Sequence, residues 1–240
     1  MLENVAVAED LSGAAAHAGR SFTPIARGRT GARARTARGR ASGPTTDDPD
    51  RALVERWKAG DESAFEAIVQ RHHKRIYRLL LRMMGSPEEA EDVTQETFLS
   101  LYRHGRSFRN ESLFSTFVYR VAANAALNRR RTLGRMRVRL QKLAEQQAAG
   151  DGLPVEPRDP EQTTEGGELG GIVHLALARL TDAQRLPIVL YDIEGRSYGE
   201  IAKILGVAEG TVKSRIHRAR QALRDELRAL LPDVDELVRR

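Results

Sequence analysis

The side chains with the most specific chemistry lie on the last expected helix, residues 209–231. On a helical wheel, Val212, Ile216, Ala219 and Leu223 fall within a narrow arc and should be buried. The opposite face carries Ser214, His217 and Arg218, flanked by Lys213 and Arg220 on one side and by Thr211 and Arg215 on the other. Such side chains can bind base edges in the major groove, and the cations can bind phosphates. The pattern predicts a DNA-binding helix; the alternative is a generic amphipathic basic helix.

Polar and aromatic side chains also gather within residues 104–131. The turn at 104–111 mixes basic, amide and aromatic side chains, among them Phe108, Arg109 and Asn110. On the next helix Arg120, Asn124, Asn128 and Arg131 recur at helical spacing, beside an inner stripe expected at Phe117, Val121 and Ala125. Arginine and asparagine suit phosphates and base edges, and aromatic rings stack on unpaired bases. We interpret this face as a nucleic-acid contact; a solvated arginine face is the alternative.

Other site chemistries find no support. Without cysteine the chain has no disulfide, thiolate zinc site or cysteine nucleophile, which suits a reducing compartment. The neighbouring His72 and His73 would point about 100° apart on a helix. No acid lies at ligand spacing from them, so no metal site is expected. No cofactor is expected either. The sequence contains no cluster of carboxylates that would indicate an enzyme.

Composition bounds the class of protein. The 240 residues include 39 Lys and Arg, 33 Asp and Glu, and 5% aromatic residues, which favours small helical units over a large β-sandwich. No apolar run approaches the ~18 residues of a membrane span. Met1 to Asp10 do not resemble a secretory signal. We therefore expect a cytoplasmic protein without membrane insertion.

Four helices are expected in the N-terminal block, at 51–59, 62–83, 87–103 and 112–131. Gly60 and Gly85 end the first two, and Ser86-Pro87 starts the third. In the third helix the buried face is expected to be Ala90, Val93, Thr97 and Leu101. Leu99 then points outward beside Asp92, Gln95 and Glu96, which is typical of a docking surface for another protein, although single exposed leucines are common.

The C-terminal block is expected to hold a helix-turn-helix. After a first helix at 172–179, a T-x-x-Q box at Thr181 and an S-x-x-E box at Ser197 each start a helix. Gly206-Val207-Ala208 makes a tight turn before the final helix, and small Ala202 lies at the expected helix crossing.

The expected fold is all-α, with two small helical domains at 49–132 and 172–231. Residues 1–48 include seven arginines and no acid between Arg20 and Arg40, and they should form a disordered arm. The arm could contact DNA; the alternatives are a spacer, a pro-segment or a mis-assigned start of the chain. Residues 133–171, with five basic and seven acidic residues, should form a flexible acidic linker that either only tethers the domains or contacts a basic channel. Residues 232–240 would be a tail.

Three sets of residues together resemble the extracytoplasmic-function (ECF) branch of bacterial RNA polymerase sigma factors. They are EAEDVTQETFL at 89–99, STFVYRVAAN at 115–124, and SYGEIA at 197–202 with GTVKSRIHRAR at 210–220. The resemblance covers about 60–131 and 172–230. A helix-turn-helix alone is weakly specific, but all three sets in this order, separated by a linker, are highly specific.

The resemblance implies a role for each surface. Core RNA polymerase would be bound through the clamp helices of its largest subunit by Asp92, Gln95, Glu96, Phe98 and Leu99, and also through its flap. The −10 element of promoter DNA would be bound and melted by Phe108, Arg109, Asn110, Thr116, Tyr119, Arg120 and Asn124. The −35 element would be bound by Arg196, Thr211, Lys213, Ser214, Arg215, His217 and Arg218. The protein would be a promoter-specificity subunit and not an enzyme, associated with the nucleoid. Because a flexible linker joins two binding faces, we expect the free protein to be restrained by an anti-sigma factor between its domains; the alternative restraint is the arginine-rich arm.

Several residues depart from the family pattern, and two other classes of protein stay open. Phe117 stands where tryptophan is usual in the family, and Thr94 and Thr97 replace more apolar residues. His217 stands where other side chains often read the promoter, so the preferred promoter sequence stays open. A two-domain repressor or activator would bind DNA without polymerase; the docking face at 92–99 argues against it. A nuclease or integrase would need a carboxylate cluster or a histidine metal site, and the sequence offers neither.

Overall fold

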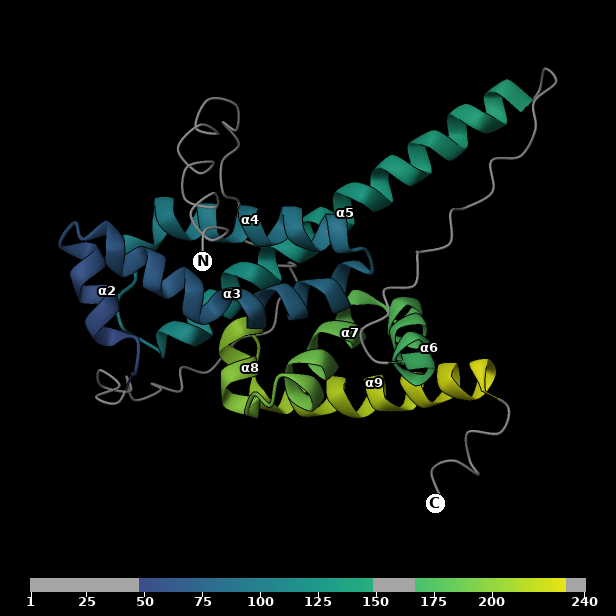
Figure 1. The fold of residues 1–240 in the computed structure, drawn as a ribbon. Coiled ribbons are helices and arrows are strands. Elements are labelled where there is room, and N and C mark those ends of the chain that lie inside the picture. Colours follow the sequence, from purple (N-terminus) through teal and green to yellow (C-terminus); the bar gives the residue numbers. More distant parts are fainter. Residues whose placement is uncertain (1–47, 149–166, 232–240) are drawn as a thin grey trace, which may run out of the picture. The chain divides into compact units, whose positions relative to one another are not determined.

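The computed structural model describes residues 48–148 and 167–231, and all regular structure in these stretches is helical (Figure 1). These residues all belong to one compact unit. The predicted all-α class is therefore confirmed for them. The arm predicted at 1–48, apart from Asp48, the tail predicted at 232–240 and residues 149–166 of the predicted linker lie outside the described residues.

Four helices form the N-terminal region: α2 (Arg51–Lys58), α3 (Glu62–Met84), α4 (Pro87–His104) and α5 (Phe114–Ala148), with a short 3-10 turn at Gly105–Ser107. Each helix contributes large side chains with at most 1% exposure to a common core: Trp57, Ile68, Leu79, Leu101 and Phe114. Burial of such side chains is the main favourable term that holds the helices together. All four residues of the buried face predicted for α4 are buried.

The ends of these helices follow from both local and distant chemistry. The side chain of Ser86 accepts a hydrogen bond from the Glu89 N–H, with Pro87 as the first helical residue, as predicted. Gly85 ends α3 at φ 84°, a left-handed conformation that glycine adopts without strain. The start of α5 depends on a residue far away, because the Asp48 carboxylate accepts the Phe114 N–H at 2.6 Å.

The C-terminal region consists of α6 (Gly167–Arg179), α7 (Asp182–Ile188), a π-helical turn (Val189–Ile193), α8 (Tyr198–Leu205) and α9 (Glu209–Leu230). The capping boxes predicted at Thr181 and Ser197 are both present. Gly206, at φ 66°, ends α8 and lets the chain turn into α9. The helix-turn-helix predicted from these signals is confirmed.

The predicted end of α5 is wrong. The helix does not stop at Arg131 to begin a flexible linker over 133–171; it continues to Ala148, and α6 begins at Gly167. A helix that is already nucleated needs only residues with good propensity to propagate, and this segment is rich in Arg, Leu, Lys, Gln and Ala. The segment is also basic and not acidic, because most of the acids predicted for the linker follow Ala148.

The prediction of which face of α5 is buried is also wrong, and the error is a shift of one residue along the helix. Phe117, Val121 and Ala125 are only half-buried. The fully buried positions are instead Phe114, Val118, Tyr119, Ala122 and Ala126. Because α5 packs against α3, α4 and α8, several of its sides are covered and its apolar pattern does not mark a single face.

Side chains of the N-terminal and C-terminal regions meet in a polar cluster around Tyr119. The Tyr119 side chain is 0% exposed, its hydroxyl donates to Glu194 Oε2 at 2.7 Å, and the Arg196 guanidinium lies 4.1 Å from the ring centroid. Burial, and then the hydrogen bond to Glu194, raise the pKa of Tyr119 to about 12. A second contact lies at the end of α3, where buried Arg185 donates to the Met83 carbonyl at 2.9 Å.

Substitution Gly105→Ala should destabilise the N-terminal region by about 1–3 kcal/mol. A Cβ at this position would lie 2.7 Å from the ring of Trp57, which is 0% exposed and has no room to move. Urea unfolding measures the loss. The control is Gly134→Ala in α5, where a Cβ meets nothing within 4 Å and helix propensity should stabilise by up to ~1 kcal/mol. Equal effects of the two variants would contradict the tight contact.

Substitution Tyr119→Phe should remove part of the alkaline loss of stability. The folded-state pKa of Tyr119, about 12, lies above its ordinary value of 10.0, so folding favours the neutral phenol. The resulting stabilisation is complete below about pH 10 and is lost as the pH rises toward about 12. The wild type should therefore lose more stability than Tyr119→Phe between about pH 9 and about pH 11 in urea unfolding. Tyr102→Phe, at an exposed position, is the control and should follow the wild type.

Candidate nucleic-acid interface

The outer face of α9 is exposed as the wheel predicts. Lys213, Ser214, His217 and Arg218 are all exposed, whereas Val212, Ile216 and Ala219 on the inner side are at most 2% exposed. Leu223, which the wheel also predicts to be buried, is half-buried. The Arg218 Nε donates to the Ser214 carbonyl at 3.3 Å, which fixes the start of the side chain and leaves its terminal nitrogens available. Thr211 and Arg215 are half-buried at the edges of the face. This arrangement presents donors of the kind that bind base edges and phosphates.

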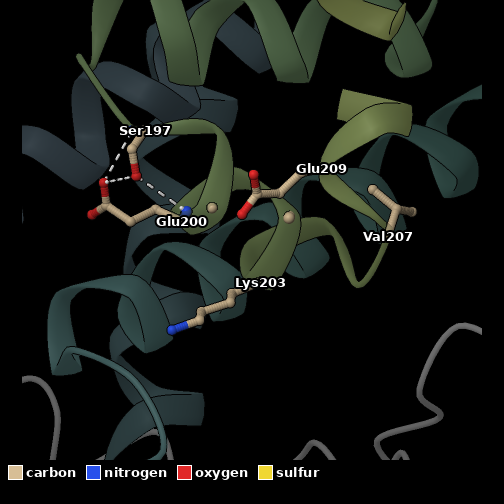
Figure 2. Close-up of a pocket in the computed structure, with 7 residues that line it drawn as sticks. Ser197, Glu200, Lys203, Val207 and Glu209 are labelled. Atoms are coloured by element: carbon tan, nitrogen blue, oxygen red, sulfur yellow. Dashed lines mark hydrogen bonds between the residues drawn. The ribbon is translucent and has the colours of Figure 1, made fainter. Parts of the chain in front are cut away.

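The helix before α9 is fixed by its cap. The Ser197 Oγ accepts the Glu200 N–H at 3.3 Å, and the Glu200 carboxylate accepts the Ser197 N–H at 3.0 Å (Figure 2). An open hollow beside this cap is lined by Ser197, Gly199, Glu200, Ala202, Lys203, Val207 and Glu209. Its charged groups are two carboxylates and one ammonium, so it does not attract a phosphate. The exposed face of α9 is the better candidate for a DNA contact.

Arg196, predicted to bind DNA beside α9, is held inside the fold. Its side chain is 13% exposed, it stacks on Tyr119, and its Nη1 donates to Glu200 Oε1 at 3.1 Å. Burial disfavours its charge, but the contacts with Tyr119 and Glu200 outweigh that and raise its pKa. The structure therefore does not place Arg196 with the exposed residues of α9.

The turn before α5 is packed around its aromatic residue. Phe108 is 8% exposed, and its ring lies 5.3 Å from Phe114 and 5.0 Å from Phe117 between centroids. Lys58 covers the same ring at 5.5 Å and donates to the Phe108 carbonyl. Asn110 adopts a left-handed backbone with φ 56°, which reverses the chain toward α5.

The predicted −10 residues divide into an exposed set and a buried set. Arg109 and Arg120 are exposed, and Asn110 and Asn124 are half-buried. Phe108, Thr116 and Tyr119 are buried and do not face solvent in this conformation. The assignment of Tyr119 comes from the family resemblance and not from the helical wheel, and Glu194 and Arg196 of the C-terminal region cover this residue.

The predicted docking face of α4 is largely exposed. Asp92, Gln95 and Glu96 are exposed, and Leu99 beside them is half-buried. Phe98 does not belong to this face: it is 4% exposed and stacks with His73 in the core, with ring centroids 6.0 Å apart. The Arg129 guanidinium pairs with Glu89 at 2.6 Å and Asp92 at 3.3 Å, which ties α5 to the edge of the face.

A buried hydrogen-bonded pair that sequence reasoning missed supports the start of this region. The His72 Nε2 lies 2.9 Å from Asp50 Oδ2, with both side chains at most 4% exposed, and Arg71 donates to the other Asp50 oxygen at 2.7 Å. Burial alone would raise the pKa of Asp50, but the hydrogen bonds from His72 and Arg71 lower it. The partners lie 22 residues apart, so no local spacing signals the pair. Within 48–148 and 167–231, no group of three or more His, Asp or Glu residues could hold a metal.

Comparisons with known proteins match both helical regions. Residues 68–136 match the family described as Sigma-70 region 2, and residues 171–223 match Sigma-70, region 4. The RNA polymerase sigma-H factor of Pseudomonas aeruginosa is 36% identical over 188 residues, which cover 78% of this chain and 97% of that protein. The ECF RNA polymerase sigma factor SigE of Mycolicibacterium smegmatis is 40% identical over 171 residues, 70% of this chain. This chain spans 64% of that relative's length.

Solved structures show the same fold. CnrH, in complex with the cytosolic domain of CnrY, matches with a TM-score of 0.54 and 26% identity, over 75% of this chain and 97% of CnrH. The sigma factor RpoE of Bartonella quintana, in complex with the anti-sigma factor NepR, matches with a TM-score of 0.50 and 24% identity, over 68% of this chain and 96% of RpoE. None of the helices in the described stretches is long and apolar enough to cross a membrane.

The two sigma-70 regions occur in the expected order, and the second of them coincides with the helix-turn-helix and its exposed polar helix. Several relatives align over nearly their whole length. The chain therefore belongs to the ECF sigma factors, the subunits with which bacterial RNA polymerase recognises promoters and starts transcription.

Proposed function

We propose that this sigma factor binds the −35 element of its promoters through the exposed face of α9. The observation that carries the proposal is the contrast along that helix, with Lys213, Ser214, His217 and Arg218 exposed and the opposite side buried in the domain. Ser214 and His217 can hydrogen-bond to base edges, and Arg218 can bind a guanine through two parallel hydrogen bonds. Lys213 and the half-buried Arg215 would bind the flanking phosphates.

The −10 element would be bound by the exposed end of the first region. Arg109, Arg120 and Asn124 offer donors to a single strand, and Arg120 also lies over the Phe117 ring at 5.2 Å. Tyr119 could join them only after the contacts of α5 with the C-terminal region separate, because Glu194 and Arg196 cover it, and buried Thr116 would also have to become exposed. Binding of flipped, unstacked bases would stabilise the melted DNA and offset an unstacking cost of a few kcal/mol.

Core polymerase would be bound by the acidic face of α4. Asp92, Gln95 and Glu96 lie on consecutive turns of one helix, with Leu99 at the edge, and together they combine charge with a small apolar surface. Such a face suits a basic, partly apolar surface on the clamp helices of the largest subunit. Phe98 supports this face from the core and is not part of it.

The proposed function also implies where the factor acts and how it is regulated. The factor would catalyse nothing itself, would act in the cytoplasm at the nucleoid with the polymerase, and would be restrained by an anti-sigma factor. The complex of the similar sigma factor RpoE with the anti-sigma factor NepR supports the last point. An inhibitor that inserts between the two regions would have to replace the Tyr119 cluster.

Substitution Arg218→Ala should reduce the binding free energy that depends on one base pair of the −35 element by about 1–3 kcal/mol. It should have little effect on the preference at the other base pairs. Run-off transcription with core polymerase, on promoter fragments that carry each single −35 substitution, measures the effect. Arg224→Ala removes the same charge from another exposed position of α9 and should leave the base preference unchanged. Equal losses of Arg218→Ala on all fragments would mean that Arg218 binds only phosphate. If the wild type did not direct the polymerase to a start site, the proposed function would be wrong.

Substitution Glu96→Lys should weaken core polymerase binding by about tenfold, because it reverses a charge at the centre of the α4 face. Competition for core polymerase against a labelled sigma factor measures the change. Glu66→Lys, the same reversal on exposed α3, is the control and should bind as the wild type does. Equal binding of both variants would remove α4 from the polymerase interface.

A further inference from the structure

The second half of α5 exposes an unusual amount of apolar surface. Met136, Val138, Leu140 and Leu143 are 56%, 54%, 59% and 45% exposed, and they are four of the seven large apolar side chains exposed in 48–148 and 167–231. This part of α5 extends beyond the other helices (Figure 1). Single exposed apolar residues are ordinary, but a group of them within eight positions marks an interaction surface.

Most of these residues form a narrow stripe along the helix. Half-buried Leu133 and the exposed Met136, Leu140 and Leu143 follow one another at steps of three, four and three residues, which is the a and d spacing of a coiled coil. Val138 lies on the opposite side of the helix. An amphipathic helix that lies on a membrane has a broad apolar face, whereas a stripe confined to a and d positions is the seam of a pair of helices.

The charges beside the stripe have one sign. Arg137 and Arg139 occupy the e and g positions that flank it, Arg135 and Lys142 lie next to them, and no acid occurs before Glu145. Arg137, Arg139 and Lys142 have neither a hydrogen bond nor an ion pair to another described residue. The flanks of the stripe therefore favour a partner with acidic side chains at its own e and g positions.

The charges and the shape also disfavour other occupants. A second copy of this chain would place arginine against arginine on both flanks, which costs stability. DNA would pair with the cations but would leave the leucine and methionine side chains uncovered. The acidic stretch that follows α5 contains Pro154, Pro157 and Pro160, which a helical occupant would not accommodate.

We propose that residues 133–143 of α5 are a docking site for an acidic amphipathic helix of another protein. That helix would place apolar side chains between Met136 and Leu140 and acidic side chains beside Arg137 and Arg139. The site is independent of promoter recognition, because it uses none of the residues assigned to DNA or to core polymerase.

The proposal is tested with the full-length chain and a fluorescent synthetic peptide of about three heptads, with Ile at a, Leu at d and Glu at e and g. Fluorescence anisotropy should show binding that weakens as salt is added, and a matched peptide with Lys at e and g should not bind. Leu140→Glu should weaken binding about tenfold. Val138→Glu makes the same charge change on the opposite side and should stay within about twofold of the wild type. Both positions are exposed, so both variants should keep the helical circular dichroism of the wild type.

Three outcomes would overturn the proposal. Equal weakening by Leu140→Glu and Val138→Glu would mean that the peptide is held by charge alone. Absence of peptide binding, with Leu140-dependent binding to phosphatidylglycerol vesicles, would identify a membrane surface instead. A dimer in sedimentation analysis that Leu140→Glu dissociates would mean that a second copy of the chain covers the stripe.

Discussion

Burial of Tyr119 is the constraint on which the contact between the two helical regions depends. A phenol without solvent access requires a hydrogen-bond partner, which Glu194 supplies, while Arg196 covers the face of the ring. A residue assigned to the −10 element and one assigned to the −35 element thereby occupy one cluster. Neither side chain can reach DNA while the cluster is intact. Separation of α5 from α8 therefore costs free energy. That free energy must come from a ligand that binds the separated form more tightly than the packed form.

The two buried arginines at this contact keep other partners when the regions separate, which lowers the cost of opening. Arg196 retains Glu200 within its own region. Arg185, whose pKa burial and then the charge of Arg130 lower to about 10, retains the carbonyls of Ala178 and Leu180. The Met83 carbonyl retains Arg130 at 2.9 Å. Arg185 and Arg196 therefore keep hydrogen-bond acceptors, and the loss of every partner is what makes breaking a buried polar contact costly.

The sequence predicts features that are decided locally and fails where distant residues decide. Ser86, Thr181 and Ser197 start helices through contacts with residues three positions away, so their motifs are sufficient. The exposed face of α9 follows from one clear apolar period. Phe98, Thr116 and Tyr119 are different, because their burial depends on packing partners elsewhere in the fold, such as Glu194 for Tyr119. The alanine-rich middle of α5 satisfies more than one helical phase, and the packing of α3, α4 and α8 against it selects the correct one.

The second half of α5 shows what helix propensity explains and what it does not. Propensity accounts for continuation of the helix to Ala148, since Arg, Lys, Gln and Leu all favour it. It does not account for apolar residues at Leu133, Met136, Leu140 and Leu143, because polar helix formers would serve equally well in water. At 100° per residue this stripe is centred roughly 160° around the helix from the polar face of Arg120, Asn124 and Arg131. A helix bound to the stripe would therefore leave that polar face open, so that occupation of the stripe and contact with DNA are geometrically compatible.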